Sequence, residues 1–164
     1  MADGSEDGIH RIGLISDTHG LLRPDVFGAL AGVETILHAG DVGGGEILDG
    51  LNAIAPVVAV YGNTDPPGDS RLAGEREGEW GGVRVHVSHG HELGVPTPER
   101  LLERYPHDVL VYGHTHRALV VRVGGRLVVN PGAAGPRRFN LAPSVAVLTI
   151  TSCAADVQLM LLRA

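Results

Sequence analysis

Six short apolar runs in this chain each stop at polar side chains of the types that bind metal ions, with glycine beside them. The first run ends in Ser16-Asp17-Thr18-His19-Gly20. Because the runs are short and lack helical periodicity, we predict that they are buried strands. In open α/β sheets, ligands bind beyond the carboxyl ends of the strands. The residues that follow the six runs are therefore expected to share one site: Asp17 and His19, Asp41, Asn63, His89, His114 and His116, and Asn130.

Helical patterns lie between these predicted strands and place the chain in the α/β class. Pro24 and Asp25 are suited to the first turn of one helix. Apolar residues at helical spacing predict a second helix over residues 46–54. Thr97 followed by Pro98 predicts the capped start of a third.

The remaining segments are predicted to be mainly β. A glycine turn within residues 119–129 predicts a hairpin, and two further strands are expected near residues 145–151 and 155–162. Residues 66–82 are rich in glycine, proline and charge, so we expect a loop with one edge strand there.

Length predicts a single domain over residues 9–164, preceded by a disordered tail over residues 1–8. A chain of 164 residues is large enough to bury a core without disulfide support. The tail is polar and acidic, unlike a secretory signal, and no apolar stretch approaches the roughly 20 residues of a membrane span. We therefore expect a cytoplasmic protein with no membrane partner.

Charge and residue usage exclude several classes of function. The formal net charge of −6 argues against a protein that binds nucleic acid through a broad basic face. All 13 basic residues are arginine, which excludes a Walker-type phosphate loop and a Schiff-base mechanism, because both need lysine. Cys153 is the only cysteine, which excludes an internal disulfide and a thiolate metal cluster.

The side chains at the expected site predict a centre of two metal ions. Oxygen and imidazole donors without sulfur favour Mn, Fe, Zn, Co or Ni over copper(I) or an iron–sulfur cluster. Seven candidate ligands are too many for one tetrahedral ion and suit two divalent ions that share a bridging carboxylate. Such a site would stay positive, attract phosphate and generate hydroxide near neutral pH. We expect manganese, with Zn, Fe, Ni or Co as alternatives.

The order and spacing of five motifs resemble those of calcineurin-like metallophosphoesterases. The motifs are Asp17-Thr18-His19, Gly40-Asp41, Gly62-Asn63-x-Asp65, His89-Gly90-His91 and Gly113-His114-Thr115-His116. The short chain is most similar to the small phosphodiesterase subgroup, which includes the retromer's phosphoesterase-like scaffold subunit. The resemblance implies a four-layer αββα sandwich, with two mainly β-sheets flanked by helices. It also implies that Asp17, His19, Asp41 and His116 hold one metal ion, while Asp41, Asn63, His89 and His114 hold the other.

One departure from the pattern of the family matters for catalysis, and a milder one is Ser16 in place of glycine before Asp17. Many members carry histidine after the asparagine, where it helps to protonate the leaving group, but this chain has Thr64. A general acid contributes roughly 10²- to 10⁴-fold in rate, so its loss favours esters with good leaving groups. Asp65, which would brace that histidine, is expected to orient metal ligands instead.

We therefore predict a dinuclear metal-dependent phosphodiesterase that hydrolyses a small-molecule or nucleotide phosphodiester by attack of a metal-bridging hydroxide. Asn63 and His114 are expected to position the phosphate, and His91 is a candidate for supplying the leaving-group proton. Arg138, on a late loop, is a candidate for phosphate contact. Two alternatives stay open: a non-catalytic scaffold that binds partner proteins, and a nucleoside polyphosphate hydrolase. The family and the exposed strand edges of a small sandwich also suggest a homo-oligomer.

Overall fold

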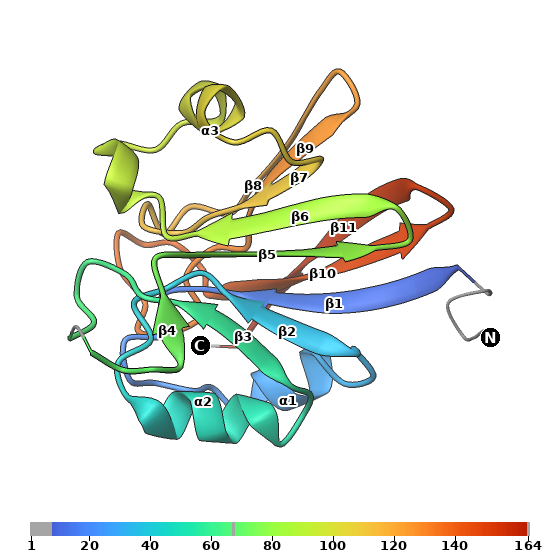
Figure 1. The fold of residues 1–164 in the computed structure, drawn as a ribbon. Coiled ribbons are helices and arrows are strands. Elements are labelled where there is room, and N and C mark those ends of the chain that lie inside the picture. The colour runs from blue at the N-terminus through green and yellow to red at the C-terminus, as the bar shows by residue number, and fades with distance from the viewer. Residues whose placement is uncertain (1–7, 67, 164) are drawn as a thin grey trace.

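The computed structural model describes residues 8–66 and 68–163, and it contains two β-sheets with short helices outside them (Figure 1). The tail expected over residues 1–8 falls, apart from Gly8, outside the described residues. The first sheet has the spatial order β11 (Ala154–Leu161), β10 (Ser144–Thr151), β1 (Ile9–Ile15), β2 (Thr35–His38), β3 (Val57–Val60) and β4 (Leu72–Ala73). The second has the order β5 (Glu75–Trp80), β6 (Val83–Ser88), β7 (Val109–Val111), β9 (Arg126–Asn130) and β8 (Leu119–Val123).

Helices cover the outer face of each sheet. They are α1 (Asp25–Ala29) and α2 (Gly45–Asn52) on the first sheet and α3 (Pro98–Arg104) on the second, as Figure 1 shows. One core cluster, with Leu14 and Val129, lies between the sheets, and a second, with Leu30 and Leu51, lies under α1 and α2. A third, with Leu101, lies under α3. Three cores between four layers confirm the predicted αββα sandwich.

Parallel pairing brings the carboxyl ends of the central strands to one edge of the molecule. β1 pairs in parallel with β2, and β2 with β3, while β6 pairs in parallel with β7. The arrowheads of β2, β3 and β6 accordingly point to the same side in Figure 1. All four residues of β2 are buried, because the core between the sheets covers one face and the helices cover the other. The loops that follow these strands therefore meet.

The segment 66–82 differs from the prediction. It forms two strands instead of one: β4, which pairs with β3, and β5, which pairs with β6 along its whole length. The six residues of β5 alternate between exposed and half-buried and include few apolar side chains, because β5 lies at the edge of its sheet. No described helix could span a membrane, since the longest, α2, has only eight residues.

Candidate metal centre

The structure brings together all seven residues that the sequence singled out as metal ligands. The Asp17 carboxylate, which follows β1, lies 3.3 Å from the Nε2 atom of His116, which follows β7. Asp41 Oδ2 lies 3.3 Å from His89 Nε2. Asn63 Oδ1 lies 3.0 Å from His89 Nε2 and 3.2 Å from His114 Nδ1. Loops from both sheets therefore contribute to one cluster.

Backbone hydrogen bonds fix these loops against one another beyond the ends of the strands. The N–H of Asp17 donates to Gly40 O, and the N–H of His19 donates to Asp41 O, both at 3.0 Å. In the second sheet, the N–H of Gly113 donates to His89 O at 3.0 Å. The side chains are thus held by backbone that is itself paired, so the site is preorganised.

Five of the seven residues have a left-handed backbone conformation. The φ angles are 53° for Asp17, 44° for His19, 55° for Asp41, 73° for His114 and 65° for His116. This region is uncommon for residues other than glycine and costs on the order of 1–2 kcal/mol per residue. Such strain concentrates at functional sites, where surrounding structure holds it. Sequence patterns gave no sign of this feature.

Two glycines let the loops approach closely enough to form the cluster. A Cβ atom at Gly62 would lie 2.1 Å from Asp41 Oδ1, and one at Gly113 would lie 2.0 Å from Ser16 Oγ. Neither position could carry a side chain without displacing the carboxylate loops. The glycines beside the predicted ligands thus serve close packing, as the sequence suggested.

The first half of the cluster consists of Asp17, His19 and His116. One ligand atom from each of these residues lies within 4.8 Å of the others. Asp17 Oδ1 and His19 Nε2 are buried, lie 3.6 Å apart and have no hydrogen-bond partner within the described residues. Buried polar atoms are rarely left unpaired, so two that face each other fit a missing cation.

The second half consists of Asp41, His89, Asn63 and His114. His89 Nδ1 lies 2.8 Å from Ala39 O; because a carbonyl only accepts, Nδ1 carries the hydrogen. In the neutral ring, Nε2 then presents a lone pair toward the oxygens of Asp41 and Asn63. Lone pairs that converge in this way fit a cation, which would satisfy all three. Asp41 Oδ2 also lies 3.6 Å from His19 Nε2, so this oxygen faces both halves.

The electrostatics of the cluster also favour positive charge. Burial raises the pKa of Asp17, but the rings of His116 and His19 lower it by more than burial raises it. The pKa of Asp17 therefore lies far below its usual range. Burial likewise raises the pKa of Asp41, while His89 and Thr64 lower it to about 2. For His89, burial lowers the pKa, but Asp41 and Asp17 raise it above the ordinary value. Both carboxylates are therefore ionised at neutral pH and attract cations.

Two polar residues brace the loops that carry the ligands. Ser16 Oγ is fully buried and donates to Asp17 Oδ2 at 2.5 Å, and the same oxygen accepts the N–H of His114 at 3.1 Å. Asn130, at the end of β9, donates through Nδ2 to Gly113 O at 3.1 Å. Asn130 therefore supports the His114 loop, and Asp17 is oriented from two directions.

Thr64, which stands where many family members have histidine, and the nearby Asp65 make contacts that differ from those expected. Thr64 donates to Asp41 Oδ1 through both its N–H, at 2.9 Å, and its hydroxyl, at 2.7 Å. Asp65 accepts the N–H groups of Val42, Gly43 and Gly62 at 2.9–3.1 Å. The direct brace on a ligand is thus Thr64, whereas Asp65 ties two loop backbones together. The sequence missed the contact of Thr64, because nothing in a motif indicates hydroxyl direction.

A buried histidine outside the ligand set also holds the loops. His38 Nδ1 accepts the N–H of Gly40 at 3.1 Å, so Nε2 carries the hydrogen and donates to Thr18 Oγ1 at 3.0 Å. Thr18 Oγ1 in turn donates to Val42 O at 2.7 Å. Burial lowers the pKa of His38 to about 4. These contacts are typical of a core histidine that holds backbone in place.

Three further residues lie at the rim of the cluster. His91 is on the 3₁₀ turn η2 (His91–Leu93), and its ring centroid is 6.4 Å from that of His114. Phe139 is 72% exposed, and its ring lies 5.9 Å from that of His116. Arg138 is exposed in the same turn, and its phosphate contact stays a prediction. No sequence pattern singles out Phe139.

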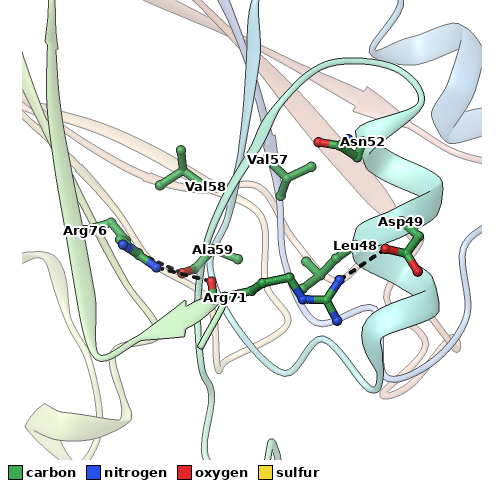
Figure 2. Close-up of a pocket in the computed structure, with 8 residues that line it drawn as sticks. All are labelled: Leu48, Asp49, Asn52, Val57, Val58, Ala59, Arg71 and Arg76. Atoms are coloured by element: carbon green, nitrogen blue, oxygen red, sulfur yellow. Dashed lines mark hydrogen bonds and ion pairs between the residues drawn. The ribbon is translucent and has the colours of Figure 1, made fainter. Parts of the chain in front are cut away.

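A separate cavity of about 420 Å³ beside α2 and β3 includes none of the predicted site residues (Figure 2). Its two arginines, Arg71 and Arg76, are already paired with protein groups. Arg71 bonds Asp49 at 3.1 Å, and Arg76 donates to Ala59 O at 3.2 Å. Both groups of described residues that could hold a metal ion lie at the strand ends, so we place the functional site there.

Comparisons with known proteins agree with this fold and this set of residues. A family model described as the calcineurin-like phosphoesterase superfamily domain matches residues 11–153. A probable metallophosphoesterase from Methanothermobacter thermautotrophicus is 35% identical over 162 residues, which cover 91% of this chain and 91% of that protein. A phosphodiesterase from Methanocaldococcus jannaschii is 32% identical over 148 residues, covering 74% of this chain and 82% of that protein.

Among solved structures, Vps29 from Chaetomium thermophilum superposes with a TM-score of 0.84 at 22% identity, covering 94% of this chain and 88% of that one. At this identity the likeness establishes the fold. The family model spans most of the chain, and the archaeal relatives align over most of their own length. This chain therefore belongs to the calcineurin-like phosphoesterase superfamily.

Proposed function

We propose that this chain is a dinuclear metal-dependent phosphodiesterase. Asp17, His19, Asp41 and His116 would hold one divalent ion, and Asp41, Asn63, His89 and His114 the other. The observation that carries the proposal is the position of Asp41 Oδ2, which faces histidine nitrogens of both halves, at 3.3 Å from His89 and 3.6 Å from His19. One carboxylate so placed suits a shared ligand. The phosphodiesterase from Methanocaldococcus jannaschii, which aligns over most of its length, supports the reaction class.

When bound, two divalent ions supply Lewis-acid chemistry: they lower the pKa of water and stabilise the attacking and leaving oxygens. The protein's own residues then orient the substrate. Asn63 directs Oδ1 toward His89 and His114, which leaves its amide nitrogen free to donate to a phosphate oxygen. His91, whose ring lies 6.4 Å from that of His114, would give a proton to a leaving oxygen on that side. Thr64 cannot do so, because its hydroxyl donates to Asp41.

The first test is turnover by metal-stripped protein refilled with Mn²⁺. We expect hydrolysis of bis(p-nitrophenyl) phosphate, a diester, with little hydrolysis of p-nitrophenyl phosphate, the monoester. The diester carries a single negative charge, whereas the monoester carries up to two. Both release p-nitrophenolate, a good leaving group that does not depend on the histidine missing at residue 64. Equal rates on both esters would contradict the preference for diesters, and His91→Gln tests the candidate proton donor.

The alternative is a phosphoesterase fold that binds partner proteins without catalysis. The likeness to Vps29 motivates it. The complete set of seven ligand residues weighs against it, because a site free of catalytic selection would be expected to lose at least one of them. Bound Mn²⁺ with no turnover of either ester would favour the scaffold role over catalysis.

A further inference from the structure

We propose that the cavity between Tyr61 and His91 binds one ester substituent of the substrate, and that it selects an uncharged planar group such as a nucleoside. The proposal rests on the proposed function, because it places the phosphate at the metal centre. The cavity has a volume of about 590 Å³, within the range of small-molecule sites. Asn63 and His91 line it, so it opens directly beside the second half of the cluster.

Two aromatic rings border the cavity. Tyr61 directly follows β3 and is 41% exposed, and its ring centroid lies 6.3 Å from that of His91 at an angle of 57°. The backbone N–H of Tyr61 donates to Ala73 O at 3.0 Å, so the strand pairing fixes its position. The Tyr61 hydroxyl makes no hydrogen bond to any described residue, and the exposed part of the side chain lines the cavity. An exposed ring of this kind is a platform for stacking a planar group.

The charge of the cavity decides between two classes of substrate. Its lining carries two carboxylates, Asp65 and Asp69, and no arginine among the residues that the structure describes. Asp65 is engaged by three backbone N–H groups. Asp69 accepts the N–H of Arg71 and lies 3.5 Å from its guanidinium, which also pairs with Asp49 at 3.1 Å. The nearby guanidinium is therefore already shared between two carboxylates, and a second phosphate in this cavity would have to compete with them. The lining accepts an uncharged substituent and disfavours a polyphosphate.

Leu72 and Pro66 add apolar surface to the lining, and Ser70 adds a hydroxyl. A nucleoside presents the matching combination of a flat base and a hydroxylated sugar. Because His91 lines the cavity and its ring lies 6.4 Å from that of His114, a substituent held there would keep its ester oxygen near the candidate proton donor. The cavity would therefore hold the leaving arm of the diester.

Binding can be measured without turnover, by calorimetry on Mn²⁺-loaded protein. We expect adenosine 5′-monophosphate to bind on the order of tenfold tighter than ribose 5-phosphate, because stacking supplies the difference. Tyr61→Ala should bring the ratio of these two affinities close to one, while Tyr61→Phe should keep the ratio of the unmodified protein. Phe139→Ala, which removes the exposed ring on the other side of the site, should leave the ratio unchanged.

Several outcomes would overturn the proposal. They are a ratio near one in the unmodified protein, a ratio that survives Tyr61→Ala, and a ratio lost in Phe139→Ala. Adenosine 5′-diphosphate that bound tenfold tighter than the monophosphate would show that the cavity accepts a second phosphate. Failure of the proposed function is distinguishable: the Mn²⁺-loaded protein would then leave bis(p-nitrophenyl) phosphate intact, whatever the binding ratio.

Discussion

Thr64 donates two hydrogen bonds to a single oxygen of Asp41, from its backbone N–H at 2.9 Å and from its hydroxyl at 2.7 Å. That oxygen is Oδ1, whereas Oδ2 faces His19 and His89. The two oxygens of one carboxylate therefore have separate surroundings. The hydroxyl that replaces the family's histidine orients the Asp41 carboxylate.

Thr64→Val removes the hydroxyl hydrogen bond while keeping the shape and the backbone contact. We expect the affinity for Mn²⁺ to fall by roughly 10- to 100-fold, the usual effect of losing a group that orients a metal ligand. Competition with a fluorescent chelator measures it. Thr64→Ser restores the hydroxyl and should restore the affinity. Wild-type Mn²⁺ binding by the valine variant would contradict this role for Thr64.

Asp41→Ala should abolish both metal loading and phosphodiester hydrolysis, because it removes the carboxylate oxygen that faces both His19 and His89. Elemental analysis of the purified protein measures the metal, and the chromogenic diester measures turnover. Asp156→Ala is the matched control, since that side chain is 86% exposed on β11 and should change neither quantity. Retained turnover in Asp41→Ala would refute the shared-ligand assignment.

Asp65→Asn should lower the free energy of unfolding by about 2 kcal/mol. The new amide group cannot accept from Val42, Gly43 and Gly62 together. Hydrogen bonds to a charged acceptor contribute roughly 1.5–3 kcal/mol. Urea denaturation of metal-free protein measures the change. Asp69→Asn, in the exposed part of the same loop, should have a much smaller effect. Equal effects of the two substitutions would show that Asp65 does not fix the loops.

His38 should make the stability of the metal-free protein depend on pH. Burial lowers the pKa of His38 to about 4 in the folded state, while the unfolded chain titrates near the ordinary value of 6.5. Between these values the unfolded state binds more protons, so stability rises with pH and is lost as pH falls below 6.5. The contribution of His38 to the free energy of unfolding should decrease by about 2 kcal/mol between pH 7 and pH 5.

The measurement is the difference in unfolding free energy between wild type and His38→Gln at both pH values. Because the other titrating groups are common to the two proteins, their contributions largely cancel. We expect the advantage of the wild type to shrink as pH falls. A difference that stays constant would mean that protonation of His38 is not linked to unfolding.

The sequence predicted the strands that end at the site because each is a short apolar run that stops at turn residues. It also predicted which residues share the site, since ligand types recur at the ends of strands that the fold pairs in parallel. The strands of segment 66–82 are harder to predict, because β5 is an edge strand with mostly polar side chains and lacks apolar alternation. Tyr61 continues the apolar run of β3 in the sequence, although the residue is 41% exposed beside the site. Such exposure depends on tertiary packing, which a single sequence does not record.

At five residues of the cluster, the left-handed backbone lowers stability while the side chain supplies a candidate metal ligand. At Asp17, His19, Asp41, His114 and His116, glycine would relieve backbone strain, but it would remove the donor atom. A population of variants selected only for thermal stability should therefore drift toward glycine or asparagine at these positions and lose metal binding as it does so. Selection for metal binding should restore the carboxylates and imidazoles. The sequence at these five sites would then record which pressure the protein had experienced.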